Sequence, residues 1–274
     1  MSQLISPSKI RQSSKAYSAG IDIPAFMQSD YVDCAAIFSD LDGCLISGET
    51  VLPGARELTV LAGNRLWIVS NNSTDTAQSL AHKLNRLGLQ VQSEQILLAG
   101  EATIRKTAKD TPQARIALYG TQLLSDLAVR LGLKPCRGEQ KDLPQYALLT
   151  RDPAFTMRDL EQLMRLVDRD VPVILANPDL IHPAADGTPV PETGALFAAL
   201  QAGFPKLNYK TYGKPSSYLV FEGLKRSGVK AADAVFIGDT PATDGQAALA
   251  AGVPFVLIQR PARISISMAE RQGL

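Results

Sequence analysis

Two aspartates that follow an apolar run are the residues of this chain best suited to do chemistry. Asp40 and Asp42 come directly after residues 35–39, Ala-Ala-Ile-Phe-Ser, which predict a buried strand. Residues two apart in a strand project from the same face, and Gly43 lets the backbone turn away immediately afterwards. Two carboxylates held that close repel, so one of them takes up a proton unless a cation shares the site. The pattern therefore predicts a hard divalent cation such as Mg²⁺ with oxygen ligands.

Polar residues also follow two other apolar runs. Residues 65–70, Arg-Leu-Trp-Ile-Val-Ser, predict a second buried strand, and Asn71 and Asn72 come after it. Residues 234–237 predict a third strand, which runs into Gly238 and Asp239. Taken alone, the first pair of aspartates could be an ordinary acidic turn, because such turns are common. Three strands that each end in polar residues favour one shared site instead.

The segments between these strands have helical spacing. One helix is predicted to open at Pro53-Gly54 and to end near Gly63, a second covers residues 77–87, and a third continues through Ala250 before the strand at 254–258. Strands that alternate with helices of this length indicate a mostly parallel sheet covered on both faces, with right-handed crossovers. In such sheets ligands bind beyond the carboxyl ends of the strands, which is where the polar residues lie.

A second group of strands and helices interrupts this pattern. Residues 115–119, 146–150 and 173–176 predict short strands, and residues 156–167 predict an amphipathic helix with Thr156 and Asp159 as a capping box. We therefore expect an inserted α/β lobe over residues 112–205. The core domain would take residues 31–111 and 206–274, and residues 1–30 would form an N-terminal extension.

Four motifs in this order resemble those of the haloacid dehalogenase superfamily of phosphatases. They are Asp40-Leu41-Asp42-Gly43, Ser70-Asn71-Asn72, Lys214 within Gly-Lys-Pro-Ser, and Gly238-Asp239 with Asp244 five residues on. The stretches at 69–73 and 176–179 look like the branch that contains para-nitrophenylphosphatase and pyridoxal phosphatase. The resemblance covers about residues 34–260, and it implies a Rossmann-like parallel-sheet core with an inserted α/β cap.

The resemblance also implies roles for the acids. Asp40 would be the nucleophile that forms an aspartyl-phosphate, and Asp42 would be the general acid and base. The Mg²⁺ would be held by Asp40, Asp239 and the main-chain carbonyl of Asp42. Asp244 would act one step away, by orienting Lys214 or a metal-bound water. Its plain alternative is a first-turn acid favoured by the helix dipole.

The phosphoryl oxygens would be met by donors from three segments. Ser70, Lys214 and the backbone at Asn71 and Asn72 fit that task, because charge spreads over these oxygens in the transition state. The alternatives are that the polar loop caps a helix beginning near Thr74 and that the lysine is solvated. His182 matches a substrate-contacting histidine of the pyridoxal phosphatases, or it is a structural loop residue.

Composition narrows the possible partners. The chain has 274 residues, a formal net charge of +1 and three cysteines, with 45% hydrophobic and 20% charged residues. No basic run interleaved with aromatic residues indicates nucleic acid, and no apolar stretch approaches the roughly 20 residues of a membrane span. We expect a cytoplasmic protein that acts on a small phosphorylated metabolite. Relatives often form homodimers through the cap.

The function predicted from these observations is a Mg²⁺-dependent phosphatase that hydrolyses small phosphomonoester metabolites through an aspartyl-phosphate. The alternative is a catalytically silent binding or sensor protein that retains the fold. A dehalogenase would not need Asp42 as a general acid. The natural substrate stays open among sugar phosphates, glycerol phosphate, phosphoglycolate, nucleoside monophosphates and pyridoxal phosphate. Cys44, beside the aspartates, is expected to make the enzyme sensitive to oxidants if it is exposed.

Overall fold

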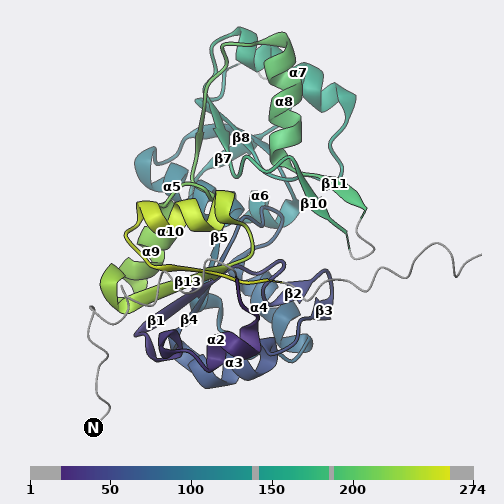
Figure 1. Cartoon of the computed structure of the whole chain (residues 1–274). Coiled ribbons are helices and arrows are strands. Elements are labelled where there is room, and N and C mark those ends of the chain that lie inside the picture. The colour runs from purple at the N-terminus through teal and green to yellow at the C-terminus, as the bar shows by residue number, and fades with distance from the viewer. Residues whose placement is uncertain (1–19, 138–141, 185–187, 260–274) are drawn as a thin grey trace, which may run out of the picture.

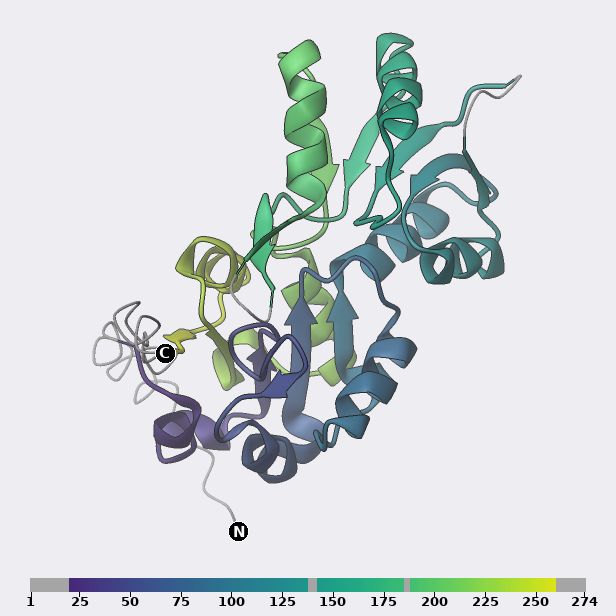
Figure 2. The same ribbon diagram turned by 90° about the vertical axis from the view of Figure 1, so that its right-hand side faces the viewer.

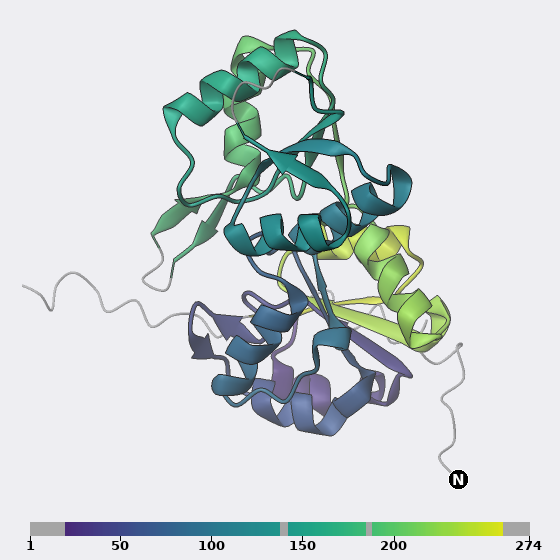
Figure 3. The same ribbon diagram turned by 180° about the vertical axis from the view of Figure 1, so that it is seen from behind.

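The chain folds into two lobes, each built on its own five-stranded sheet (Figure 1). The computed structural model describes residues 20–137, 142–184 and 188–259. The view from behind shows the same separation of the lobes (Figure 3). The lower lobe is the core domain, and the upper lobe is the inserted cap.

The core sheet has the strand order β14-β13-β1-β4-β5, and every pairing in it is parallel. Its strands are β1 (Ala36–Ser39), β4 (Leu66–Ser70), β5 (Ile96–Leu98), β13 (Ala234–Gly238) and β14 (Phe255–Leu257). The three strands expected to carry the site therefore lie next to one another in the centre of the sheet. Their carboxyl ends point toward the cap (Figure 2).

Successive residues of the core strands pack into two different clusters, as the period of two in a strand requires. Ile37 and Ile68 pack with α3 (Ala55–Ala62), α4 (Ala77–Arg86) and the short α2 (Ile23–Met27). Phe38 and Val69 pack with α9 (Tyr218–Ser227) and α10 (Gln246–Ala250). The predicted parallel sheet with helices on both faces is confirmed.

Part of the expected N-terminal extension packs on the core. Phe26 in α2 and Tyr31 in the 3₁₀ turn η1 (Asp30–Asp33) are fully or almost fully buried. Residues 1–19 lie outside the described part of the chain. The segment from 20 to 33 is thus docked against the first cluster rather than loosely attached.

The cap contains a second parallel sheet, in the order β12-β9-β8-β6-β7. Its strands are β6 (Arg115–Tyr119), β7 (Lys134–Cys136), β8 (Tyr146–Leu149), β9 (Val173–Leu175) and β12 (Tyr209–Thr211). Its helices are α6 (Gln122–Arg130), α7 (Met157–Asp168) and α8 (Thr193–Gly203), and α5 (Ala99–Asp110) leads into it from the core. Strand β12 belongs to this sheet although it lies beyond residue 205, where we expect the lobe to end.

Two small hairpins and several single turns complete the fold. The antiparallel pair β10 (Ile181–Pro183) and β11 (Pro189–Pro191) reaches from the cap toward the core (Figure 2), and β2 (Ile46–Ser47) pairs with β3 (Thr50–Val51). The turns are η2 (Gly63–Arg65), η3 (Ser93–Gln95), η4 (Ala231–Asp233) and the π-helical η5 (Pro241–Gly245). None of the helices in the described ranges is both long and apolar enough to cross a membrane.

Candidate active site

A cavity of about 340 Å³ lies where the ends of the core strands face the cap. The core contributes eleven of its lining residues and the cap contributes five. The lining residues are Asp40, Asp42, Ser70, Asn71, Asn72, Ser73, Thr74, Lys214, Asp239, Thr240 and Thr243 from the core, with Arg151, Asp179, Ile181, His182 and Glu192 from the cap. Every residue that the sequence predicts for the site, except Asp244, therefore lines the same cavity.

Lys214 joins the first and last motifs at the floor of this cavity. Its Nζ donates to Asp40 Oδ1 and to Asp244 Oδ1, both at 2.6 Å. The lysine is 2% exposed. Burial alone would lower the pKa of its ammonium group, but the carboxylates of Asp244 and Asp40 outweigh burial and raise it. Lys214 is therefore a fixed cation within reach of the proposed nucleophile.

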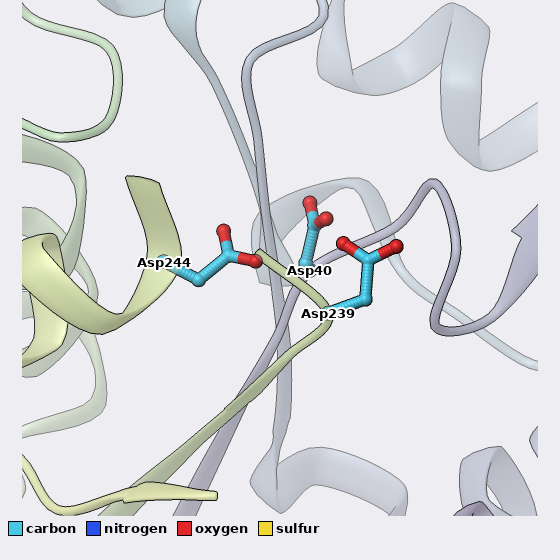
Figure 4. Close-up of side chains that lie close together, drawn as sticks. All are labelled: Asp40, Asp239 and Asp244. Atoms are coloured by element: carbon cyan, nitrogen blue, oxygen red, sulfur yellow. The ribbon is translucent and has the colours of Figure 1, made fainter. Parts of the chain in front are cut away.

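Three carboxylates converge beside this lysine. Oxygens of Asp40, Asp239 and Asp244 lie within 4.8 Å of one another (Figure 4). Asp244 is already engaged through both oxygens, because its Oδ2 accepts the backbone N–H of Thr240 at 3.1 Å. Asp40 and Asp239 are thus the better placed ligands, and an all-oxygen donor set suits a hard divalent cation.

Burial raises the pKa of Asp40 well above its usual range, against the opposing effect of the Lys214 charge. The neighbouring charges of Asp244 and Asp42 act in the same direction as burial. A divalent cation reverses this balance, because it favours the ionised carboxylate. The residues present therefore fit a Mg²⁺ site, and a cation there would keep Asp40 ionised and nucleophilic.

The backbone turn after β1 brings Asp42 to the same cavity. Gly43 has φ +90°, a conformation that favours glycine, and its N–H donates to the Ile46 carbonyl at 2.7 Å. The tight turn leaves Asp42 exposed on the cavity wall, whereas Asp40 is buried at its base. The two aspartates thus lie at different depths of one cavity.

The polar loop after β4 has a structure of its own. Ser70 Oγ accepts the Asn72 N–H at 3.1 Å, and Asn72 Oδ1 accepts the N–H groups of Thr74 and Asp75 at 3.0 and 2.9 Å. The Asn72 side chain therefore shapes the loop. The alternative of a helix cap at this loop is wrong, because α4 begins later, with Thr76 as its N-cap.

The Asn71 side chain ties the loop to two distant segments. Its Nδ2 donates to Asp179 of the cap at 2.9 Å and to the Lys214 carbonyl at 3.0 Å, and its Oδ1 accepts the Lys214 N–H at 2.7 Å. Asn177 Nδ2 in turn donates to the Asn71 carbonyl at 2.8 Å. Asn71 thus holds the lysine loop in place and links the core to the cap.

The cap wall contains residues that the sequence analysis did not nominate. Arg151 lies two residues after the end of β8, and Glu192 directly precedes α8. Arg151 Nε and His182 Nδ1 lie 3.6 and 2.8 Å from Glu192 Oε1. The rule that ligands gather at strand ends, applied to the inserted sheet as well, would have found Arg151. Glu192 carried no such signal, because it follows a hairpin that the sequence did not reveal.

Cys44 is buried, with 1% of its surface exposed. Burial, reinforced by the charge of Asp40, raises the pKa of its thiol well above the usual range. The expected sensitivity to oxidants requires an exposed thiol, and the Cys44 thiol is buried. The side chain packs in the first hydrophobic cluster of the core.

Comparisons with known proteins agree with this geometry. Residues 37–134 match the family model described as haloacid dehalogenase-like hydrolase, and residues 211–261 match the one described as HAD-hydrolase-like. Chronophin of Mus musculus is 31% identical over 220 residues, which are 76% of this chain and 75% of chronophin. D-glycerol 3-phosphate phosphatase of Mycobacterium tuberculosis is 27% identical over 82% of this chain, and the match spans 62% of that relative's length.

A solved structure has the same fold. The p-nitrophenyl phosphatase from Archaeoglobus fulgidus superposes with a TM-score of 0.74 at 29% identity, over 88% of this chain and 94% of that one. Its similarity extends over both lobes, since either lobe alone is far shorter than the matched length. Together with the strand-end aspartates and the buried lysine, these matches mean that the chain belongs to the haloacid dehalogenase-like hydrolases, in the phosphatase branch of that family.

Proposed function

We propose that this chain is a Mg²⁺-dependent phosphatase that hydrolyses small phosphomonoester metabolites through an aspartyl-phosphate on Asp40. The observation that carries the proposal is the contact of Lys214 Nζ with Asp40 Oδ1 at 2.6 Å, beside the carboxylate of Asp239. This arrangement supports the proposal because it brings the carboxylates of Asp40 and Asp239 together with a buried ammonium group.

In the first step, a carboxylate oxygen of Asp40 attacks phosphorus and the bond from phosphorus to the ester oxygen breaks. Asp42 gives its proton to the departing alkoxide. Lys214 is aimed at the phosphoryl oxygens, where charge is spread in the transition state. Asp40 and Asp239 would hold the Mg²⁺, which supplies positive charge against the phosphate dianion when bound.

In the second step, the roles of the two aspartates are reversed. Asp42, now ionised, takes a proton from a water molecule that attacks phosphorus of the aspartyl-phosphate. The bond between phosphorus and Asp40 breaks, phosphate leaves, and the carboxylate is restored. The exposed position of Asp42 in the cavity suits a group that must reach first the departing alkoxide and then the attacking water.

The cap supports a preference for small substrates. It contributes five side chains to a cavity of about 340 Å³, a volume suited to a metabolite rather than to a folded protein segment. Relatives are named D-glycerol 3-phosphate phosphatase, dihydroxyacetone phosphatase and acid sugar phosphatase. A cytoplasmic location, the absence of a nucleic-acid partner and dimerisation through the cap stay predictions.

The test is phosphate release from a panel of small phosphate esters, with and without Mg²⁺. We expect turnover that needs the metal and that falls by at least about 10³-fold in Asp40→Asn, because the amide is not a nucleophile. Asp126→Asn, at an exposed position on α6 that does not line the cavity, is the matched control. Turnover retained in Asp40→Asn would refute the assigned nucleophile. A wild-type chain that binds phosphate esters without hydrolysing them would support the silent binding protein instead.

A further inference from the structure

The cap wall of the cavity holds a buried acceptor without a donor. Glu192 Oε2 is buried and has no hydrogen-bond partner among the described residues. Its side chain is 14% exposed and lines the cavity. A buried carboxylate oxygen without a donor is costly, so a group that enters the cavity with an O–H is the natural partner for this atom.

We propose that Glu192 selects a leaving group that is neutral, aliphatic and hydroxylated, so that the preferred substrates are phosphates of small polyols or sugars. This inference deepens the proposed phosphatase function and rests on it. The phosphoryl end of a substrate belongs at Asp40 and Lys214 on the core side. Its other end then meets the cap residues Arg151, Asp179 and Glu192.

The other cap side chains suit hydroxyl groups as well. Asp179 accepts from Asn71 through Oδ2, Arg151 can only donate, and His182 can do either. A hydroxyl group both donates and accepts, so neighbouring hydroxyls of a polyol can pair with this mixture. Ile181 is the one large apolar side chain among the described residues that line the cavity, and none of those residues is Phe, Tyr or Trp. An aromatic leaving group would find no Phe, Tyr or Trp ring to stack on, and the one ring on the wall, the His182 imidazole, already lies against Glu192.

The charge of the wall disfavours an acidic leaving group. Asp179 and Glu192 are two acids against the single guanidinium of Arg151, which already lies 3.6 Å from Glu192. Burial raises the pKa of both acids, against the opposing charges of Lys214 near Asp179 and of His182 and Arg151 near Glu192. A carboxylate on the substrate would add a third negative charge and could not donate to Glu192 Oε2.

The experiment compares kcat/KM for glycerol 3-phosphate with n-propyl phosphate, which has the same three carbons and no further hydroxyl. We expect glycerol 3-phosphate to be preferred by about tenfold or more, because a site built to bind a hydroxyl discriminates against its loss. 2-Phosphoglycolate and pyridoxal 5′-phosphate test the acidic and aromatic classes, and both should be slower than glycerol 3-phosphate by at least about tenfold.

The variant Glu192→Gln replaces the orphaned acceptor by an amide of the same shape. We expect the ratio of kcat/KM between the polyol and propyl esters to fall by about tenfold, and a cooperative thermal melt near the wild-type Tm shows that the variant is folded. Glu161→Gln, on the exposed face of α7 beside Arg165, is the control and should leave the ratio unchanged.

The possible results distinguish failure of the proposed substrate preference from failure of the proposed phosphatase function. Equal or faster turnover of propyl phosphate, phosphoglycolate or pyridoxal phosphate would overturn the inference while the phosphatase stands. An unchanged ratio in Glu192→Gln would overturn the role of Glu192. If the wild-type chain hydrolyses none of the esters, both the proposed function and this inference fail.

Discussion

Replacing Asp244 by asparagine tests whether this acid acts through Lys214. Asp244 is fully buried, and its two oxygens accept from Lys214 Nζ at 2.6 Å and from the Thr240 N–H at 3.1 Å. Asparagine keeps the shape but offers only one oxygen, so its NH₂ group must face one of the two donors. Of its two carboxylate partners, Lys214 Nζ then keeps only that of Asp40.

The expected loss follows from these contacts. A hydrogen bond to a charged group contributes about 1.5–3 kcal/mol, so we expect the free energy of unfolding to fall by about 2–3 kcal/mol. That corresponds to a decrease in Tm of about 5–10 °C for a chain of this size. If the same interaction positions the lysine in the transition state, kcat falls by about 30- to 150-fold.

Both quantities should be measured at saturating Mg²⁺, because neutralising Asp244 also relieves its repulsion from Asp40, and a bound cation already offsets that repulsion. Thermal melts give the Tm, and steady-state kinetics separate kcat from KM. Asp110→Asn is the matched control: its carboxylate pairs with Lys106 on the surface, where such a pair contributes less than about 1 kcal/mol. An Asp244→Asn enzyme with wild-type kcat would refute the positioning role.

Three further outcomes are expected. Asp239→Asn should lose most of the Mg²⁺-induced rise in Tm measured by a fluorescence melt, because it removes a carboxylate from the cluster; an unchanged rise would exclude Asp239 as a ligand. Asn71→Ala deletes hydrogen bonds to Asp179 and to both backbone groups of Lys214 and should lower kcat by about tenfold or more, whereas wild-type kinetics would contradict the link. The raised pKa of Cys44 keeps its thiol protonated at pH 8, so iodoacetamide should modify this residue only after unfolding. Mass spectrometry locates the modified cysteines, and rapid labelling of Cys44 in the native chain would count against its burial.

The core and the floor of the cavity could be predicted from the sequence because local patterns determine them. The apolar runs that end at Ser70 and before Asp239 lie on either side of β1 in the parallel sheet, and a glycine at position 43 permits the positive φ of the turn. The network of Asn71 could not be predicted in this way, since its partners at 179 and 214 are more than a hundred residues away. The same holds for Glu192, whose position depends on how the cap sits over the core.

The helix α7 illustrates the other limit of pattern reading. Its capping box of Thr156 and Asp159 is confirmed. Its apolar stripe does not lie wholly in the core, however: Leu163 is buried, whereas Met157 is 78% exposed at the first turn. Periodicity identifies the face that turns inward, but how far the neighbouring elements extend over that face is a property of the tertiary structure.

Lys214 stands three residues beyond β12, the last strand of the cap sheet, and this spacing has a consequence for protein engineering. Gly213, between them, approaches its surroundings so closely that a Cβ there would lie 2.5 Å from the Ala176 carbonyl oxygen and 2.8 Å from Asn71 Oδ1. A chimera that exchanges one lobe between relatives would need its junction after Lys214, or it would have to keep Gly213 and the residues that pack around it. The junction at which the chain returns from the cap sheet to the core therefore also carries the buried ammonium group that contacts Asp40, so an exchange of one lobe alters the other.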